Sequence, residues 1–129
     1  AHKSIGFTSL GQLRYLSALQ YVDAMVGNSS SGLTEAPSFR IATINIGDRQ
    51  KGRIKADSII DCEPRKASIT KVFEDIYTKN FQNALKIVNN TYGDGCASKK
   101  VIEEIKKVDL DNILKKPFYD TKTNSNENK

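Results

Sequence analysis

The feature that most constrains this chain is a serine- and glycine-rich turn between a short apolar strand and a brief helix. Residues 23–26 predict a buried strand, and the run GNSSSG at 27–32 follows it directly. Pro37 limits the next helix to about one turn. Backbone N–H groups at the start of that helix, its dipole and the three serine hydroxyls are available to a phosphate. We therefore predict a phosphate site at this turn.

Glu35 indicates what the phosphate belongs to. It lies one helical turn after Ser31, on the same helix face. A carboxylate repels phosphate but accepts hydrogen bonds from hydroxyls, so a ribose suits it, and the turn with Glu35 predicts a bound nucleotide. The alternative is ordinary helix capping, although a capping box needs Ser or Thr at position 32, where the chain has Gly. Both interpretations stay open, because a helix N-terminus satisfies both.

Length and composition exclude several other classes. A chain of 129 residues suits one domain with a modest core. Cys62 and Cys96 have no partner spacing and His2 is the only histidine, so we expect no metal site and no Ser-His-Asp triad built within this chain. We also expect no cofactor. No membrane-spanning run and no leader is present, and with two unpaired cysteines this predicts a cytoplasmic protein. The net charge of +5 fits an anionic ligand or simple solubility.

Hydrophobic periodicity predicts the remaining elements. We expect further strands at 41–46 and 58–62, and helices at 12–20 with Ser9 as its cap, after Pro64, at 80–88 and at 97–107. The first helix should bury Leu10, Leu13 and Leu16, with Ala18 or Leu19 as a further buried position. The helix after Pro64 should bury a stripe formed by Ile69, Val72, Phe73, Ile76 and Tyr77. The pattern predicts an α/β fold with parallel strands.

A polar loop, 47–53, follows the second strand. Ligands of open parallel sheets bind beyond the carboxyl ends of strands, where this loop and the serine turn should be neighbours. Arg49 and Arg53 carry fork-shaped donors suited to phosphate. The alternative is a solvated basic loop with no ligand.

Three motifs together resemble a known family: GNSSSGLTEAPSF at 27–39, NIGDRQKGR at 45–53 and YGDG at 92–95. In this order and spacing they strongly resemble the C-terminal part of hydrolysing UDP-N-acetylglucosamine 2-epimerases, the enzymes that open sialic acid synthesis. The resemblance extends to Tyr119. We therefore predict a UDP-binding domain at 1–119, truncated at its start, and a disordered tail at 120–129.

The resemblance implies a Rossmann-like parallel sheet with flanking helices, as part of the C-terminal half of a glycosyltransferase-B type fold. It implies that Ser29 and Ser30 bind the diphosphate, that Glu35 binds the ribose and that Arg49 lines the nucleotide site. Family members eliminate UDP to form a glycal and then add water, releasing N-acetylmannosamine and UDP for sialic acid or capsule sugar synthesis.

The acid and base groups of that family lie in the N-terminal half. We therefore assign no catalytic residue here and expect this chain alone to be inactive. The expected partners are a UDP-sugar and the missing N-terminal half, with neither nucleic acid nor membrane, and the intact enzyme is expected to be a homo-oligomer.

The chain departs from the family pattern at two positions, with Thr91 where proline is frequent and Cys96 where asparagine is common. A sister branch acts on diacetylated bacillosamine nucleotides, and the motifs do not separate the two branches. Two other classes stay open. One is the C-terminal domain of a UDP-sugar glycosyltransferase. The other is a basic interaction module, although the chain lacks the aromatic platform or basic helix expected of a nucleic-acid binder.

Overall fold

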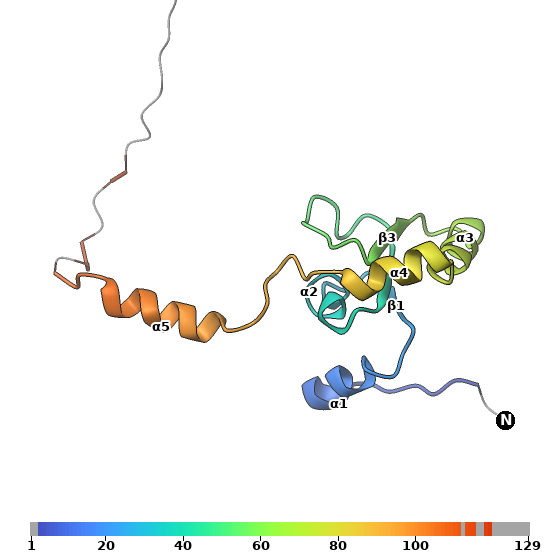
Figure 1. The fold of residues 1–129 in the computed structure, drawn as a ribbon, viewed down its shortest axis with the longest axis horizontal. Helices are drawn as coiled ribbons and strands as arrows, with labels where there is room; N and C mark the ends of the chain where they lie inside the picture. Colours follow the sequence, from blue (N-terminus) through green and yellow to red (C-terminus); the bar gives the residue numbers. More distant parts are fainter. Residues whose placement is uncertain (1–2, 112, 116–117, 120–129) are drawn as a thin grey trace, which may run out of the picture. The chain divides into compact units, whose positions relative to one another are not determined.

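The computed structural model describes residues 3–111, 113–115 and 118–119 (Figure 1). Three strands form a parallel sheet in the order β1 (Ala24–Gly27), β2 (Ala42–Ile46) and β3 (Ile59–Cys62). Ala24 pairs with Ala42, and Thr43 pairs with Ile59. The predicted α/β class and the Rossmann-like parallel sheet with flanking helices are confirmed.

Successive side chains of β2 point to opposite faces of the sheet, and each face is covered differently. On one face, Ala42 and Ile44 are fully buried against α3 (Lys66–Ile76) and α4 (Lys79–Ile87), which lie against the sheet in Figure 1. The main buried residues that these helices and β3 add to this core are Cys62, Val72, Ile76 and Leu85. This face is the larger apolar core of the chain.

The opposite face of β2 is polar. Its residues Thr43 and Asn45 are buried beneath the short helix α2 (Ser31–Thr34) and the 3-10 helix η1 (Ala36–Phe39). The Thr43 hydroxyl donates to the carbonyl oxygen of Gly32 at 3.0 Å. The serine turn is therefore fastened to the sheet by a buried hydrogen bond.

The first helix, α1 (Gly11–Ala18), differs from its prediction in cap and buried face. Leu10 occupies the N-cap without a side-chain hydrogen bond, and Ser9 instead accepts from the Gly11 amide at 3.2 Å. Leu13, predicted to be buried, is 81% exposed. The apolar contacts of this helix are made by its C-terminal half and by the residue that follows it, because only that part meets α2, η1 and β1. The residues in contact are Tyr15, Leu16 and Leu19.

The stripe predicted on α3 is only partly correct. Val72 and Ile76 are buried and Ile69 packs against them, but Phe73 is 40% exposed and Tyr77 is 60% exposed. Residues 69, 72 and 76 share one line along a helix, whereas 73 and 77 lie about 100° farther round. Because α3 rests on the sheet with one face, the second line stays in solvent.

Contacts divide the chain into two units, one ending at Asp94 and the other beginning at Gly95. The second unit contains α5 (Ala97–Lys107), at the predicted bounds, and the apolar residues Val101, Ile102 and Ile105 on it are exposed. Its N-cap, Cys96, has a φ of 59°. That left-handed conformation is uncommon for residues other than glycine, and among them it is enriched for asparagine.

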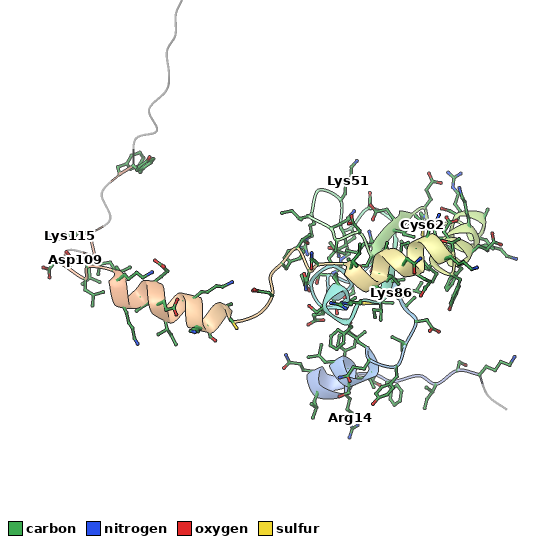
Figure 2. The ribbon with its side chains drawn as sticks, viewed as in Figure 1. Arg14, Lys51, Cys62, Lys86, Asp109 and Lys115 are labelled. Carbon is green, nitrogen blue, oxygen red and sulfur yellow. The ribbon has the colours of Figure 1, made fainter. Side chains whose placement is uncertain are left out.

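Positive charge is distributed over several elements: Figure 2 shows Arg14 on α1, Lys51 in the loop after β2 and Lys86 on α4. None of the helices within the described residues is long and apolar enough to cross a membrane. The predicted tail at 120–129 lies outside the described residues.

Candidate functional site

The serine turn begins where β1 ends, and it presents two exposed hydroxyls. Ser29 and Ser30 are exposed, and Ser30, at the N-cap of α2, makes no capping hydrogen bond with its side chain. Ser29 does act as a local cap, because its Oγ accepts from the Ser31 amide at 3.3 Å. Helix capping therefore accounts for the Ser29 hydroxyl but not for the Ser30 hydroxyl.

The backbone of the turn differs from its prediction. The amides of Gly32 and Leu33 donate to the carbonyl oxygens of Ser29 and Ser30 at 3.2 and 2.9 Å, and Ser29 Oγ takes the Ser31 amide. These three amides are not free, because a tight turn satisfies them internally. With only four residues, α2 also has a weak dipole. The exposed hydroxyls of Ser29 and Ser30 are thus among the groups that the turn still offers to a phosphate.

Gly32 serves packing between α2 and β2. A Cβ atom built at Gly32 would lie 2.6 Å from Thr43 Cγ2, a side chain that is 2% exposed. Neither partner has free space to move into. The glycine in this motif therefore allows α2 to approach the sheet closely.

We expect the substitution Gly32→Ala to destabilise the fold by about 1–3 kcal/mol, because it overpacks a buried contact. Chemical denaturation followed by circular dichroism measures this change. Gly6→Ala is a matched control, since a Cβ there meets nothing within 4 Å. A Gly32→Ala protein as stable as the control would contradict this interpretation.

Glu35 lies half-buried at the C-terminal end of α2, within a hydrogen-bonded group. Ser31 Oγ donates to Glu35 Oε2, which confirms that the two residues share one helix face. The hydroxyl of Tyr15, from α1, contacts the same Ser31 Oγ and lies 3.4 Å from Met25 Sδ. The Ser31 hydroxyl, predicted to be a donor for phosphate, is thus engaged with Glu35.

Glu35 also lines an open cavity of about 730 Å³ beside α1. Residues 9–12, Phe7 and Tyr15 form the rest of its lining. The cavity therefore brings an acceptor, Glu35, together with apolar and aromatic side chains from the start of the chain. That combination suits an uncharged, hydroxyl-bearing group better than a phosphate.

The loop that carries Arg49 is held against the serine turn, as predicted. Gln50, only 2% exposed, donates from Nε2 to the carbonyl oxygen of Asn28 at 2.7 Å. Arg49, the preceding residue, is exposed, and its guanidinium makes no ion pair among the described residues. Sequence reasoning placed this loop correctly but missed Gln50, because its burial depends on a tertiary contact.

The turn cluster at 89–95 joins the same region from a distance in sequence. Asn90 Nδ2 donates to the Thr34 carbonyl oxygen at 2.8 Å and to Ser38 Oγ at 2.7 Å. Tyr92 donates its hydroxyl to the Ile54 carbonyl oxygen at 3.1 Å. These contacts hold α2, η1 and the loop after β2 in one arrangement. An asparagine in a turn cluster gives no sequence signal of such a role.

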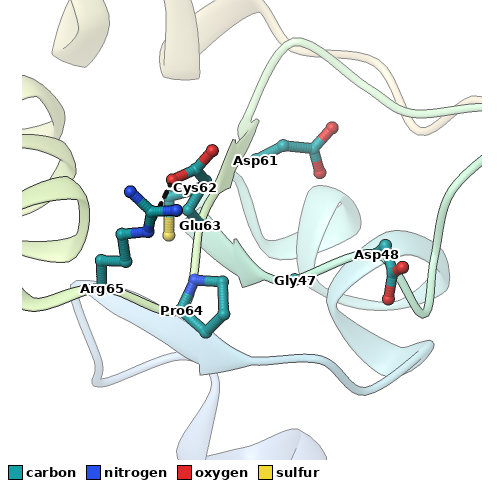
Figure 3. Close-up of a pocket in the computed structure, with 7 residues that line it drawn as sticks. All are labelled: Gly47, Asp48, Asp61, Cys62, Glu63, Pro64 and Arg65. Carbon is teal, nitrogen blue, oxygen red and sulfur yellow. Dashed lines mark ion pairs between the residues drawn. The ribbon is translucent and has the colours of Figure 1, made fainter.

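A second cavity, of about 600 Å³, opens at the carboxyl ends of β2 and β3 (Figure 3). Gly47, Asp48 and residues 61–65 line it, and Glu63 pairs with Arg65 at 3.2 Å. With three carboxylates and one cation, the lining does not suit a diphosphate. None of Ser29, Ser30, Glu35 and Arg49 belongs to it.

Two groups at this second cavity have shifted pKa values. Burial raises the pKa of the Cys62 thiol, and the charge of Asp61 adds to the shift. For Asp61 itself, burial acts to raise the pKa, but hydrogen bonds from Lys55 and Asn45 and the Lys55 charge outweigh it, so the pKa is lowered. Asp61 is therefore a stable anion, and Cys62 is a poorly reactive thiol.

Comparison with known proteins supports the motif analysis. Residues 2–106 match the family model described as UDP-N-acetylglucosamine 2-epimerase. The chain is 44% identical over 121 residues to the GDP/UDP-N,N'-diacetylbacillosamine 2-epimerase (hydrolyzing) of Campylobacter jejuni, covering 93% of this chain and 31% of that protein. It is 38% identical over 107 residues to the polysialic acid biosynthesis protein P7 of Escherichia coli, covering 82% and 27%.

A third relative is the UDP-N-acetylglucosamine 2-epimerase of Neisseria meningitidis, with 41% identity over 58 residues, which covers 45% of this chain and 15% of that protein. The chain thus spans less than a third of the length of each of these relatives.

Proposed function

Because this chain belongs to the UDP-N-acetylglucosamine 2-epimerase family, we propose that it is the UDP-binding part of an enzyme that converts UDP-N-acetylglucosamine and water to N-acetylmannosamine and UDP. Ser29 and Ser30 bind the diphosphate, Glu35 binds the ribose and Arg49 lines the nucleotide site. One observation carries this proposal: two exposed serine hydroxyls stand at the start of a one-turn helix, and a half-buried glutamate that lines a cavity stands at its end.

The charges of these groups support that division of roles. Hydroxyls donate to phosphate oxygens, and a guanidinium adds positive charge and paired donors. Glu35 accepts hydrogen bonds and repels anions, so it suits the ribose hydroxyls and keeps the phosphates at the serine end. The contact between Gln50 and Asn28 supports placing Arg49 beside the same ligand.

A second candidate substrate is a nucleotide of N,N'-diacetylbacillosamine. The C. jejuni protein named for that sugar matches 93% of this chain, whereas the N. meningitidis protein named for N-acetylglucosamine matches 45%. The longer match is the observation that supports this sugar as the alternative substrate. The proposed UDP site is the same for both sugars, because the residues assigned to it face the nucleotide.

The other two classes have less support. Family membership favours water over a sugar acceptor, which a glycosyltransferase would require. A basic interaction module would need its cations gathered on one surface. Here Arg14, Lys51 and Lys86 come from a helix, a loop and another helix (Figure 2). We further propose that the acid and base groups, and the contacts of a homo-oligomer, belong to other parts of the protein.

The substitution Glu35→Gln tests the ribose assignment. It keeps the shape and one acceptor oxygen but removes the charge that strengthens hydrogen bonds from the ribose hydroxyls. We expect UDP binding to weaken by roughly 1–2 kcal/mol, the value of one charge-assisted hydrogen bond, and pyrophosphate binding to stay unchanged. NMR titration of the chain measures both affinities.

Glu74→Gln is the matched control, since it removes the same charge from an exposed position on α3. Equal weakening of UDP and pyrophosphate in Glu35→Gln would mean that Glu35 maintains the turn and does not bind the ribose.

A further inference from the structure

We propose that Tyr15 and Ser31 form a hydroxyl relay that positions the Glu35 carboxylate, so that Ser31 is a positioning residue and not a ligand of the diphosphate. This inference rests on the proposed ribose role of Glu35. It links three residues from two elements: Tyr15 lies on α1, Ser31 begins α2 and Glu35 follows its last residue.

The side-chain contacts of these three residues form one continuous series. Ser31 Oγ donates to Glu35 Oε2, and the Tyr15 hydroxyl contacts Ser31 Oγ from the other side. Both contacts are partly buried, in contrast to the exposed side chains of Ser29 and Ser30. The relay therefore lies on the inner side of the turn, away from the two serines assigned to the diphosphate.

Proton counting fixes the direction of the relay. An ionised carboxylate only accepts, and each hydroxyl carries a single proton. The Ser31 proton is committed to Glu35, so Ser31 Oγ accepts the proton of Tyr15. Met25 Sδ, 3.4 Å from the Tyr15 hydroxyl, is a weak acceptor and competes poorly. Ser31 therefore has no proton left to donate to a phosphate oxygen.

The relay gives Glu35 one preferred orientation before any ligand binds. A free glutamate side chain samples many rotamers, and ordering it costs up to about 2 kcal/mol. Here Ser31 donates to Oε2 of Glu35, which leaves Oε1 of Glu35 as the acceptor for a ligand hydroxyl. That hydroxyl would come from the cavity that Glu35 and Tyr15 both line. Binding then requires less ordering of Glu35.

The test compares Ser31→Ala, Ser31→Thr and Tyr15→Phe in the whole chain, with Tyr21→Phe as the matched control. Tyr21 is 87% exposed, so its hydroxyl can be removed without touching the relay. In the free protein, three-bond NMR couplings report whether Glu35 occupies one rotamer or several. We expect one rotamer in the wild type, Ser31→Thr and Tyr21→Phe, and averaging in Ser31→Ala.

Ligand titrations give the second readout. In Ser31→Ala we expect UDP to bind roughly 2- to 10-fold more weakly, while pyrophosphate and 2′,3′-dideoxy-UDP, which lacks the ribose diol, are unaffected. Ser31→Thr should restore UDP binding, because it keeps the hydroxyl. Tyr15→Phe should weaken UDP by about 2-fold, near the lower end of the same range.

Three results would overturn the relay: averaged Glu35 couplings in the wild type, weaker pyrophosphate binding in Ser31→Ala, or equal effects of Tyr15→Phe and Tyr21→Phe. Failure of the wild type to bind UDP would instead contradict the proposed function. In that case the couplings of the free protein still decide whether the relay positions Glu35.

Discussion

Incubation of this chain with UDP-N-acetylglucosamine, or with the diacetylbacillosamine nucleotide, should release no UDP above the uncatalysed rate. The residues assigned here are proposed to bind and orient a nucleotide, and none of them is assigned a proton transfer at the sugar. Asp61 has a lowered pKa, because hydrogen bonds from Lys55 and Asn45 and the Lys55 charge outweigh the effect of burial, so it is a poor proton donor at neutral pH.

A coupled assay for UDP measures this release. The N. meningitidis UDP-N-acetylglucosamine 2-epimerase serves as the positive control under the same conditions. Turnover that survives rigorous purification of the chain would contradict the prediction and would move the chemistry into residues that we assign to binding.

The second large effect is expected from Ser30→Asp. The substitution places a negative charge where the diphosphate is proposed to bind, and like charges brought together cost a few kcal/mol before solvent screening. UDP affinity should fall roughly 10- to 100-fold, an estimate from that like-charge penalty. Fold stability should change little, because the Ser30 side chain is exposed and makes no capping hydrogen bond, and aspartate is favoured at an N-cap position.

NMR titration and thermal melting, applied to the same samples, separate the two effects. Ser98→Asp, an exposed position in the first turn of α5, adds the same charge elsewhere and should leave UDP binding unchanged. Unchanged UDP binding in Ser30→Asp would mean that the serine turn only caps a helix.

Local sequence patterns were sufficient to predict most of the fold. The β-branched run at 41–46 predicted β2, the amphipathic pattern at 97–107 gave the bounds of α5, and parallel pairing followed from strands separated by helices or long loops. Errors arose where burial depends on the neighbour of a helix. Leu13, Phe73 and Tyr77 fit a helical period, yet α1 and α3 each contact the chain along one narrow face.

The candidate site likewise contains residues that the sequence predicts and residues that it does not. Ser29, Ser30, Glu35 and Arg49 could be selected from the sequence, because they lie in two short motifs at the ends of predicted strands. The side chains that hold those two motifs together could not be selected from the sequence. Tyr15 and Gln50 reach the serine turn from 16 and 22 positions away, and Asn90 reaches α2 from 56 positions away, through side-chain hydrogen bonds that leave no periodic signal.

Titration of the isotope-labelled chain with UDP, followed through its backbone amide signals, tests the proposed site most directly. The predicted result is saturable shifts at residues 29–35 and around Arg49, with little change at residues 61–65 in the acid-rich cavity. Absence of shifts at saturating UDP, or shifts confined to residues 61–65, would contradict the assignment of the serine turn as the nucleotide site.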